Sequence, residues 1–248
     1  MAVHFGYFAL DAYIISCVII VAAFAIRGMI GFGSGLISVS LLIFFLPIKE
    51  VVPVVFLLGA VAALALGSYD FKEVAWAEMP WLWIFTIFGL IIGAWILKAL
   101  PTQSVTVLLG IFILVYVLYA LITKPEGMPS VARFWGAPLG FLGGVIGSLY
   151  GGGGPSIVAY LQMRHLNKRA FRASFQFIAV TDAVVRGALY FFLGLLNRHT
   201  VLTAAWLLPA VGIGLVSGNI LHFRIKPKPF QYLVLVVLAL VGIKLVIP

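Results

Sequence analysis

The amino-acid sequence predicts an all-α polytopic membrane protein built from two homologous repeats. Of its 248 residues 64% are hydrophobic and 9% are charged, with a mean hydropathy of +1.20. Charged residues make up roughly 25% of a typical soluble domain, so this composition excludes a soluble fold. Apolar runs close to the roughly 17 to 25 residues that span a bilayer recur along the chain. They are 12–26 with its flanks, 51–66, 80–97, 105–122, 201–221 and 230–247.

The charges and the cysteine exclude other classes of protein. A net charge of +9 can indicate nucleic-acid binding, but the basic residues lie in short loops between apolar runs, where the positive-inside bias places them. The connections 164–172 and 224–228 are expected on the cytoplasmic side. Residues 1–11 contain no Lys or Arg, so they lack the basic start of a secretory signal and the first segment is expected to stay in the protein. Cys17 is the only cysteine, which excludes an intrachain disulfide and a cysteine metal cluster.

Glycine motifs recur in the same order in both halves of the chain. Gly28-Met-Ile-Gly31 is matched 116 residues later, and Gly33-Ser-Gly35 is matched 119 residues later. The difference requires three extra residues near 148–150, which we interpret as an additional loop. Other equivalent pairs are Gly89 and Gly214, Gly93 and Gly218, Pro101 and Pro227, and Lys49 and Lys168. The sequence therefore predicts a first membrane repeat over 1–123, a linker over 124–130 and a second repeat over 131–248, as in many transporters.

Each repeat has about five apolar segments, and the second one is short in both. These short segments cover 32–46 and 153–166. A helix of about 15 residues is about 22 Å long, less than the roughly 30 Å of the hydrocarbon core, so we expect these segments to be broken or re-entrant. If they span, each half crosses the membrane five times and the halves are inverted. If they turn back, each half crosses four times and the halves are parallel, so the total is 8 to 10 crossings.

Arg27 is the most specific polar residue of the chain. It follows fifteen apolar or small residues and directly precedes the first glycine motif. A guanidinium at this depth is costly unless it pairs or faces water, and its planar fork of donors suits carboxylate, sulfonate or phosphate oxygens. We favour a role in a polar cavity over the alternative, an arginine that extends from a helix end to the lipid headgroups.

The two glycine stretches can supply backbone N–H groups to an anion. A helix that begins near Gly35 would direct its first amides and a partial positive charge into the protein. The second stretch leads into Pro155, which suits the first turn of a helix. Hydroxyls of Ser34, Ser148, Tyr150 and Ser156 can add donors. The alternative is close packing of helices through small residues, which for any single glycine is the stronger interpretation.

The third apolar segment of the second half, 170–195, contains several polar residues. Gln176, Asp182 and Arg186 share one stripe at helical spacing. Asp182 and Arg186 are four residues apart and can pair. An internal ion pair that only holds helices together is as good an interpretation as a functional one, in which Arg186 binds substrate and Asp182 orients it or accepts a coupling proton.

Enzyme motifs are absent from the sequence. The four histidines lie near segment ends, no His-Glu-x-x-His occurs, and the glycines 151–154 are not followed by the Lys and Ser or Thr of a nucleotide-binding loop. Gly33-Ser34-Gly35 lacks the first glycine of a nucleophile turn, and no base accompanies it. We therefore expect no enzyme activity, metal or cofactor.

The two G-x-x-G-x-G-x-G elements, each followed by a short apolar helix, a charged turn at Lys49 or Lys168 and a longer helix, resemble the TauE/SafE family of sulfite-exporter-like transporters, also called the toluene sulfonate uptake permease family. The resemblance covers essentially the whole chain. Arg27-Gly28 is similar to the branch with an arginine before the first cluster, whereas Ser34 interrupts the family's run of glycines. The resemblance implies secondary transport of small anions, often sulfur oxyanions or sulfonates, in a bacterial inner membrane and without a cofactor.

The sequence thus predicts a secondary transporter of small anions, such as sulfur oxyanions, organosulfonates or similar organic acids, with a midplane site between the repeats. Its expected partners are a small anion and the lipid bilayer, with no nucleic acid, and a homo-oligomer stays open. The alternative is a non-transporting membrane assembly subunit. The expected substrate-binding residues are Arg27, Gly31, Gly33, Ser34, Gly35, Ser148, Tyr150, Gly152, Gly153, Gly154, Ser156, Gln176 and Arg186, with Asp182 as the candidate for coupling.

Overall fold

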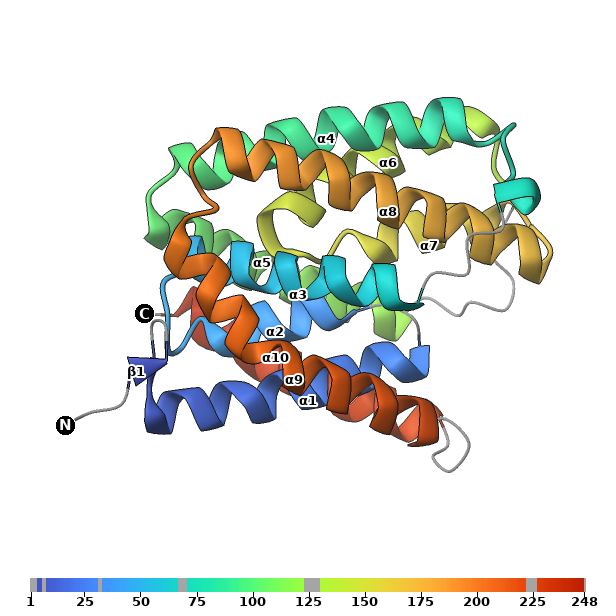
Figure 1. Cartoon of the computed structure of the whole chain (residues 1–248). Coiled ribbons are helices and arrows are strands. Elements are labelled where there is room, and N and C mark those ends of the chain that lie inside the picture. The colour runs from blue at the N-terminus through green and yellow to red at the C-terminus, as the bar shows by residue number, and fades with distance from the viewer. Residues whose placement is uncertain are drawn as a thin grey trace. The chain divides into compact units, whose positions relative to one another are not determined.

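The computed structural model describes residues 4–5, 8–30, 33–66, 71–122, 130–221 and 227–247 (Figure 1). Apart from a hairpin of two short strands, the regular structure in these ranges is helical. The predicted linker lies outside the described residues except for Ser130. The elements are β1 (His4–Phe5), β2 (Phe8–Ala9), α1 (Leu10–Ile30), α2 (Ser34–Leu42), α3 (Ile48–Leu66), η1 (Phe71–Glu73), α4 (Met79–Ala99), α5 (Thr102–Ile122), η2 (Arg133–Trp135), α6 (Gly136–Tyr150), α7 (Gly154–Met163), α8 (Lys168–Phe192), α9 (Arg198–Leu221) and α10 (Pro227–Val246).

Six of the described helices are long and apolar enough to cross a membrane. Their candidate spans are Ala12–Met29, Ile48–Ala65, Met79–Ala99, Thr102–Ile122, Lys168–Phe192 and Arg198–Ile220. The prediction of a polytopic helical membrane protein is confirmed. The two segments predicted to be short are shorter still, because α2 has 9 residues and α7 has 10.

The chain divides into two compact units, each described here by itself. Unit 1 comprises 1–58, 100–123 and 196–248, and unit 2 comprises 59–99 and 124–195. Each unit therefore takes helices from both halves of the sequence. The predicted repeats and the compact units are different divisions of the chain.

In unit 1, small residues bring α1 and α9 into close contact, as Figure 1 shows at the two ends of the colour scale. A methyl group on Gly28 would lie 2.8 Å from the carbonyl oxygen of Leu215, and one on Gly214 would lie 2.7 Å from that of Val21. A methyl group on Gly110 of α5 would lie 3.0 Å from the carbonyl oxygen of Gly242 of α10. Glycine is needed at these positions because the backbones of neighbouring helices touch.

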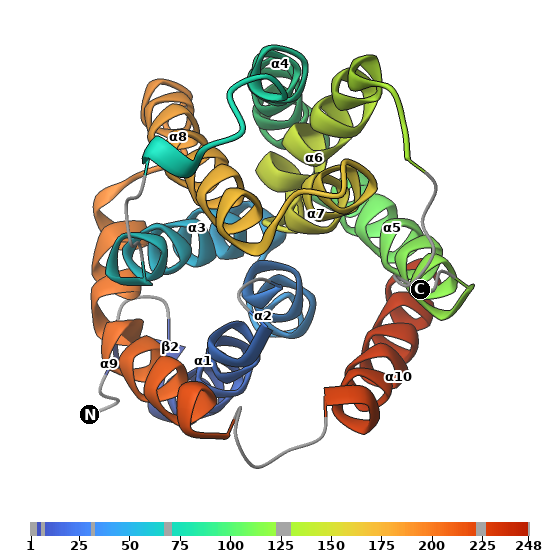
Figure 2. The ribbon, with the colours of Figure 1, turned by 90° about the vertical axis from the view of Figure 1, so that its right-hand side faces the viewer.

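In unit 2, the same kind of contact joins α4 and α6, which lie side by side in Figure 2. A methyl group on Gly93 would lie 2.5 Å from the carbonyl oxygen of Val145, and one on Gly89 would overlap the carbonyl oxygen of Phe141. From the other side, a methyl group on Gly144 would overlap the backbone of Thr86. These glycines are packing residues, as the structural interpretation of single glycines predicted.

The short helix α7 runs back along α6. A methyl group on Gly143 would lie 3.2 Å from the carbonyl oxygen of Gly153 and 3.1 Å from Ile157, while one on Gly136 would lie 3.1 Å from the Tyr160 ring. Residues late in α7 thus contact residues early in α6, as in a helical hairpin. Such antiparallel packing fits both the spanning and the re-entrant alternative for the second short segment.

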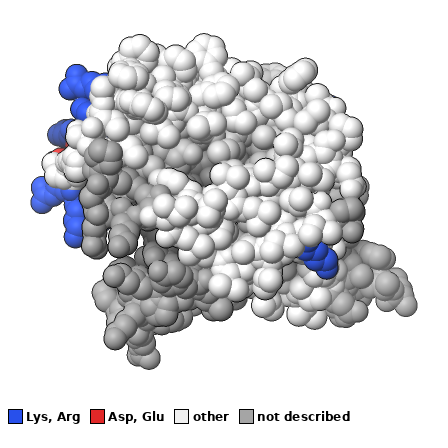
Figure 3. Space-filling view, turned by 180° about the vertical axis from the view of Figure 1, so that it is seen from behind, with Lys and Arg blue, Asp and Glu red and all other residues white. Residues whose placement is uncertain are grey.

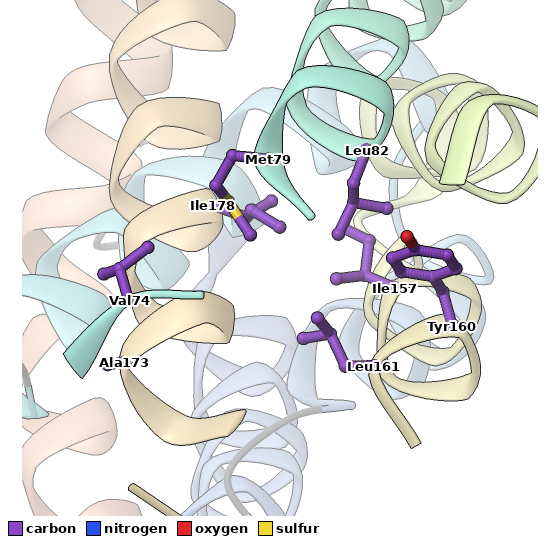
Figure 4. Close-up of a cluster of buried hydrophobic side chains, with 8 residues drawn as sticks. All are labelled: Val74, Met79, Leu82, Ile157, Tyr160, Leu161, Ala173 and Ile178. Atoms are coloured by element: carbon purple, nitrogen blue, oxygen red, sulfur yellow. The ribbon is translucent and has the colours of Figure 1, made fainter. Parts of the chain in front are cut away.

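The core of unit 2 joins α7 to α4 and α8. Buried side chains of these three helices and of the segment before α4 form one cluster, shown in Figure 4: Val74, Met79, Leu82, Ile157, Tyr160, Leu161, Ala173 and Ile178. Tyr160 is fully buried at one side of it, and its ring belongs to the cluster while its hydroxyl bonds to polar groups described below. The apolar cluster holds α7 against its neighbours.

The outer surface carries many large apolar side chains. Trp95 is 64% exposed and Phe192 is 83% exposed. On the face drawn in Figure 3, nearly all described atoms belong to uncharged residues, and basic side chains gather at one edge. Such a surface is suited to contact with lipid.

Candidate functional site

Two helix breaks carry most of the predicted site residues, one in each unit. We call the end of α1, residue Gly33 and the start of α2 the first junction. The end of α6, residues 151–153 and the start of α7 form the second junction. In both, a helix ends near glycine and a short helix begins within four residues.

The first junction places Arg27 beside the start of α2. Gly33 has a φ of 94°, which favours glycine, and Ser34 begins the helix and is 2% exposed. Nη1 of Arg27 donates a hydrogen bond to Oγ of Ser34 at 3.5 Å, and the guanidinium lies 6.0 Å from the ring centroid of Phe24. The predicted association of Arg27 with the first glycine stretch is therefore present, while Gly31 lies outside the described residues.

The short helices begin without side-chain caps. Gly33 before α2 and Gly153 before α7 provide no side-chain hydrogen bond to the first turn. In contrast, Asn167 caps α8 by accepting a bond from the amide of Ala170 at 2.8 Å. Helix starts of this uncapped kind direct backbone N–H groups and a partial positive charge at whatever lies before them, which suits an anion.

At the second junction, α6 is longer than expected. Residues 148–150 form its last turn, so our interpretation of them as an additional loop is wrong. Gly151 ends the helix with a φ of 67°, and its amide donates to the carbonyl oxygen of Gly147 at 2.9 Å. The three residues extend the helix up to Gly151, whose left-handed conformation ends it.

Side chains of α8 bind the C-terminal end of α6. Arg186 donates to the carbonyl oxygen of Gly147 and to Asp182, confirming the predicted pair, and Tyr190 donates to the carbonyl oxygen of Ser148. Both carbonyls lie in the last turn of α6, and that of Gly147 also accepts from the amide of Gly151. With no water in a bilayer core, such groups must be satisfied inside the protein.

Gln176, a predicted substrate ligand, bonds to a helix end as well. Its side-chain amide donates to the carbonyl oxygen of Ala63 at 2.9 Å. Ala63 is among the last four residues of α3, so Gln176 bonds to the C-terminal turn of that helix. Together with Arg186 and Tyr190, Gln176 makes α8 a helix whose polar side chains cap two other helices of unit 2.

The remaining predicted ligands of the second junction are packed closely. Oγ of Ser148 donates to the carbonyl oxygen of Leu90 at 2.9 Å, and Tyr150 is 2% exposed. Gly152 and Gly153 are buried, whereas Gly154 and Ser156 in the first turn of α7 are half-buried. Gly154 and Ser156 are therefore the predicted residues of this junction that keep the most accessible surface.

Sequence analysis missed a polar cluster around Glu78, the residue before α4. Its carboxylate accepts two bonds from Arg164, at 2.9 and 3.1 Å, and one from the Tyr160 hydroxyl at 2.6 Å. Arg133 lies 3.4 Å away. Burial raises the pKa of Glu78, but the bonds from Arg164 and Tyr160 and the two arginine charges outweigh this and hold it below its ordinary value.

This Glu78 cluster fixes the far end of α7. Tyr160 and Arg164 lie at that end, whereas Glu78 and Arg133 precede α4 and α6. Glu78 is 4% exposed. The sequence signal was a charged residue directly before an apolar run, which alone did not indicate its partner. In the described part of the chain, no three metal-ligating side chains come together.

Comparisons with known proteins agree with the helical membrane architecture. The family model described as sulfite exporter TauE/SafE matches residues 16–245. The probable inner membrane transporter protein TsaS of Comamonas testosteroni is 28% identical over 195 residues, which cover 77% of this chain and 80% of that protein. No solved structure matches the chain. These similarities indicate a membrane transporter and not an enzyme, and the chain belongs to the sulfite exporter TauE/SafE family.

Proposed function

We propose that the protein is a secondary transporter of small anions, such as sulfur oxyanions, organosulfonates or similar organic acids, in a cell inner membrane. The first junction supports this proposal most directly. It combines an arginine inside a candidate membrane span, a buried serine bonded to it, and a helix start without a side-chain cap. A positive charge and backbone donors at membrane depth are what an anion needs when it leaves water.

The glycine contacts support the two repeats of the proposal, 1–123 and 131–248. Gly28 of α1 packs on α9, and its predicted equivalent Gly144 of α6 packs on α4. In turn, Gly218 of α9 packs on α1, and its equivalent Gly93 of α4 packs on α6. Equivalent residues thus serve equivalent helix pairs, which is expected of transporter repeats with a midplane site between them.

The transport test compares arginine variants in proteoliposomes. Arg27→Ala removes the charge at the first junction, and a charge-assisted bond is worth about 1.5–3 kcal/mol, so uptake at low anion concentration should fall about 10-fold to 100-fold. Arg27→Lys keeps the charge but loses the fork, and an intermediate rate is expected. Arg198→Ala, which removes an exposed arginine at the start of α9, is the matched control. If Arg27→Ala carries sulfite, sulfonates and carboxylates as fast as the parent, Arg27 is not in the site.

Asp182 is proposed as the coupling residue. Its carboxylate pairs with Arg186, which also binds the end of α6. Protonation of Asp182 would release one bond of Arg186 and so link a proton to the second junction. The variant Asp182→Asn tests this link: pH-driven uptake should stop while exchange of anion without a pH gradient continues. Unchanged pH-driven uptake would remove Asp182 from the mechanism.

A further inference from the structure

Ser38, in the middle of α2, has a buried hydroxyl that the fold does not use. The residue is 0% exposed, and among the described residues its Oγ has no hydrogen-bond partner. Buried polar groups in proteins nearly always have a partner, so each exception requires an explanation. An absent ligand is one explanation, and the surroundings of Ser38 favour it.

Several other buried hydroxyls on the helices of this protein bond to the backbone of their own helix, and Ser148 bonds to the backbone of α4. Ser16 donates to Ala12 at 2.7 Å, Ser40 to Leu36 at 2.6 Å and Thr86 to Leu82 at 2.7 Å. Each bond reaches the carbonyl four residues earlier, the usual arrangement for serine or threonine within a helix. Ser38 departs from this arrangement although Ser40, two residues later on the same helix, follows it. In the described part of the chain Thr203 is also buried without a partner, but it lies on α9, which carries no predicted site residue.

Ser38 lies one helical turn after Ser34, the residue of the first junction that Arg27 contacts. Ser34 and Ser38 are four residues apart, so they lie on one face of α2 with their Cβ atoms about 5–6 Å apart. Side chains of a helix lean toward its N-terminus, which brings Ser38 toward Ser34 and the uncapped first turn. Arg27 already donates to Ser34. Arg27, Ser34 and Ser38 thus form a row of donors that leads from the charge into the buried face of α2.

We propose that Ser38 is a substrate-binding residue that donates its hydroxyl to one oxygen of an anion held by Arg27 and the first turn of α2. The inference rests on the proposed anion transport and extends its site by one helical turn. Donors spread over a turn require an anion with at least two acceptor oxygens, because a single-atom halide cannot reach both ends of the row. The site should therefore discriminate oxyanions from chloride through Ser38.

The first experiment compares Ser38→Ala with Ser40→Ala, a matched control on the same helix. Ser38→Ala should lower the affinity for sulfite, measured by KM for uptake and by the anion-dependent rise in Tm, by about 10-fold. The Tm without anion should not fall, since the removed hydroxyl has no partner. Ser40→Ala should keep the parent's affinity. If Ser38→Ala binds sulfite as the parent does while Arg27→Ala does not, this inference is overturned and the proposed function stands.

The second experiment measures access to Ser38 without requiring transport. In a Cys17→Ala background, Ser38→Cys and Ser40→Cys are treated with an anionic methanethiosulfonate reagent. Faster labelling at position 38, slowed by sulfate but not by chloride, is expected. If the parent shows no saturable anion transport, the proposed function fails, and this labelling still decides whether Ser38 faces an anion path. Equal labelling at both positions, with no protection by sulfate, would overturn the inference on its own.

Discussion

At the second junction, side chains from the neighbouring helix α8 cover the end of α6, whereas at the first junction the bond that reaches Ser34 comes from Arg27, in the last turn of α1. Arg186 and Tyr190 bind carbonyls in the last turn of α6, and Gln176 binds one in the last turn of α3. The difference suggests different tasks. Donors already bonded to carbonyls hold a helix end in place, while at the first junction Arg27 bonds to a serine that lies one turn before the unused hydroxyl of Ser38.

The two short helices differ at their far ends as well. Arg164, just after α7, binds Glu78 and fixes that helix to the start of α4. At the position 119 residues earlier, unit 1 has Phe45, which is 43% exposed. Unit 1 thus has no arginine at the position equivalent to Arg164, which in unit 2 binds Glu78. We interpret the second junction as the more rigid element and the first as the one that contacts the anion.

The largest expected effect is a difference in stability between variants of the two arginines, Arg186 and Arg27. Arg186→Met leaves Asp182 as a buried charge without its partner and the end of α6 without its cap, and such losses cost about 3–5 kcal/mol. Arg27→Met removes the long hydrogen bond to Ser34 and the contact with the Phe24 ring, and should cost less than Arg186→Met, about 1–2 kcal/mol. Thermal unfolding in detergent measures both. The double variant Asp182→Asn/Arg186→Met should recover part of the loss, and equal destabilisation by the two arginine changes would contradict the comparison.

The next effect concerns the Glu78 cluster and depends on pH. Glu78→Gln removes the charge that binds Arg164 and should cost about 1.5–3 kcal/mol at neutral pH. Because the folded pKa of Glu78 lies below its ordinary value of 4.5, the stabilisation is present above that value and is lost as the pH falls through the folded pKa. The difference in Tm between parent and variant should be large at neutral pH and shrink at about pH 3. A difference that stays constant with pH would show that the charge does not stabilise unit 2.

A smaller effect tests whether equivalent glycines serve both units. Gly144→Ala and Gly28→Ala each place a methyl group against the backbone of a neighbouring helix, and overpacking of this kind costs about 1–3 kcal/mol. Gly212→Ala is the control, since nothing lies within 4 Å of the added carbon. Both packing variants should lower the Tm, and Gly212→Ala should leave it unchanged or raise it. A lower Tm in only one of these two variants would weaken the case for repeats.

The smallest expected effect is that of Gln176→Leu. The change removes the bond to the carbonyl oxygen of Ala63, which is worth about 1 kcal/mol. If Gln176 only caps α3, KM for anion uptake should stay at the parent's value while the Tm falls slightly. A raised KM with an unchanged Tm would show that Gln176 contributes to anion binding. That result would weaken the division of tasks between the junctions.

The sequence by itself determined the membrane class, the long helices and the two breaks, because hydropathy and backbone freedom act over a few neighbouring residues. Asp182 and Arg186 could be paired in advance because they lie one turn apart on one helix. The two glycine stretches marked the breaks, but the residues that end or begin each helix, Gly151 and Gly33 with their positive φ, were known only from the structure.

Only the tertiary structure decided what the polar residues bind. Gln176 reaches a carbonyl 113 residues away and Arg164 reaches a carboxylate 86 residues away. Such partners depend on which helices pack together, and one sequence contains no local signal for that choice. The unused hydroxyl of Ser38 likewise became visible only when the bonds of its neighbours were known, because a serine in an apolar helix is ordinary until its expected partner is missing.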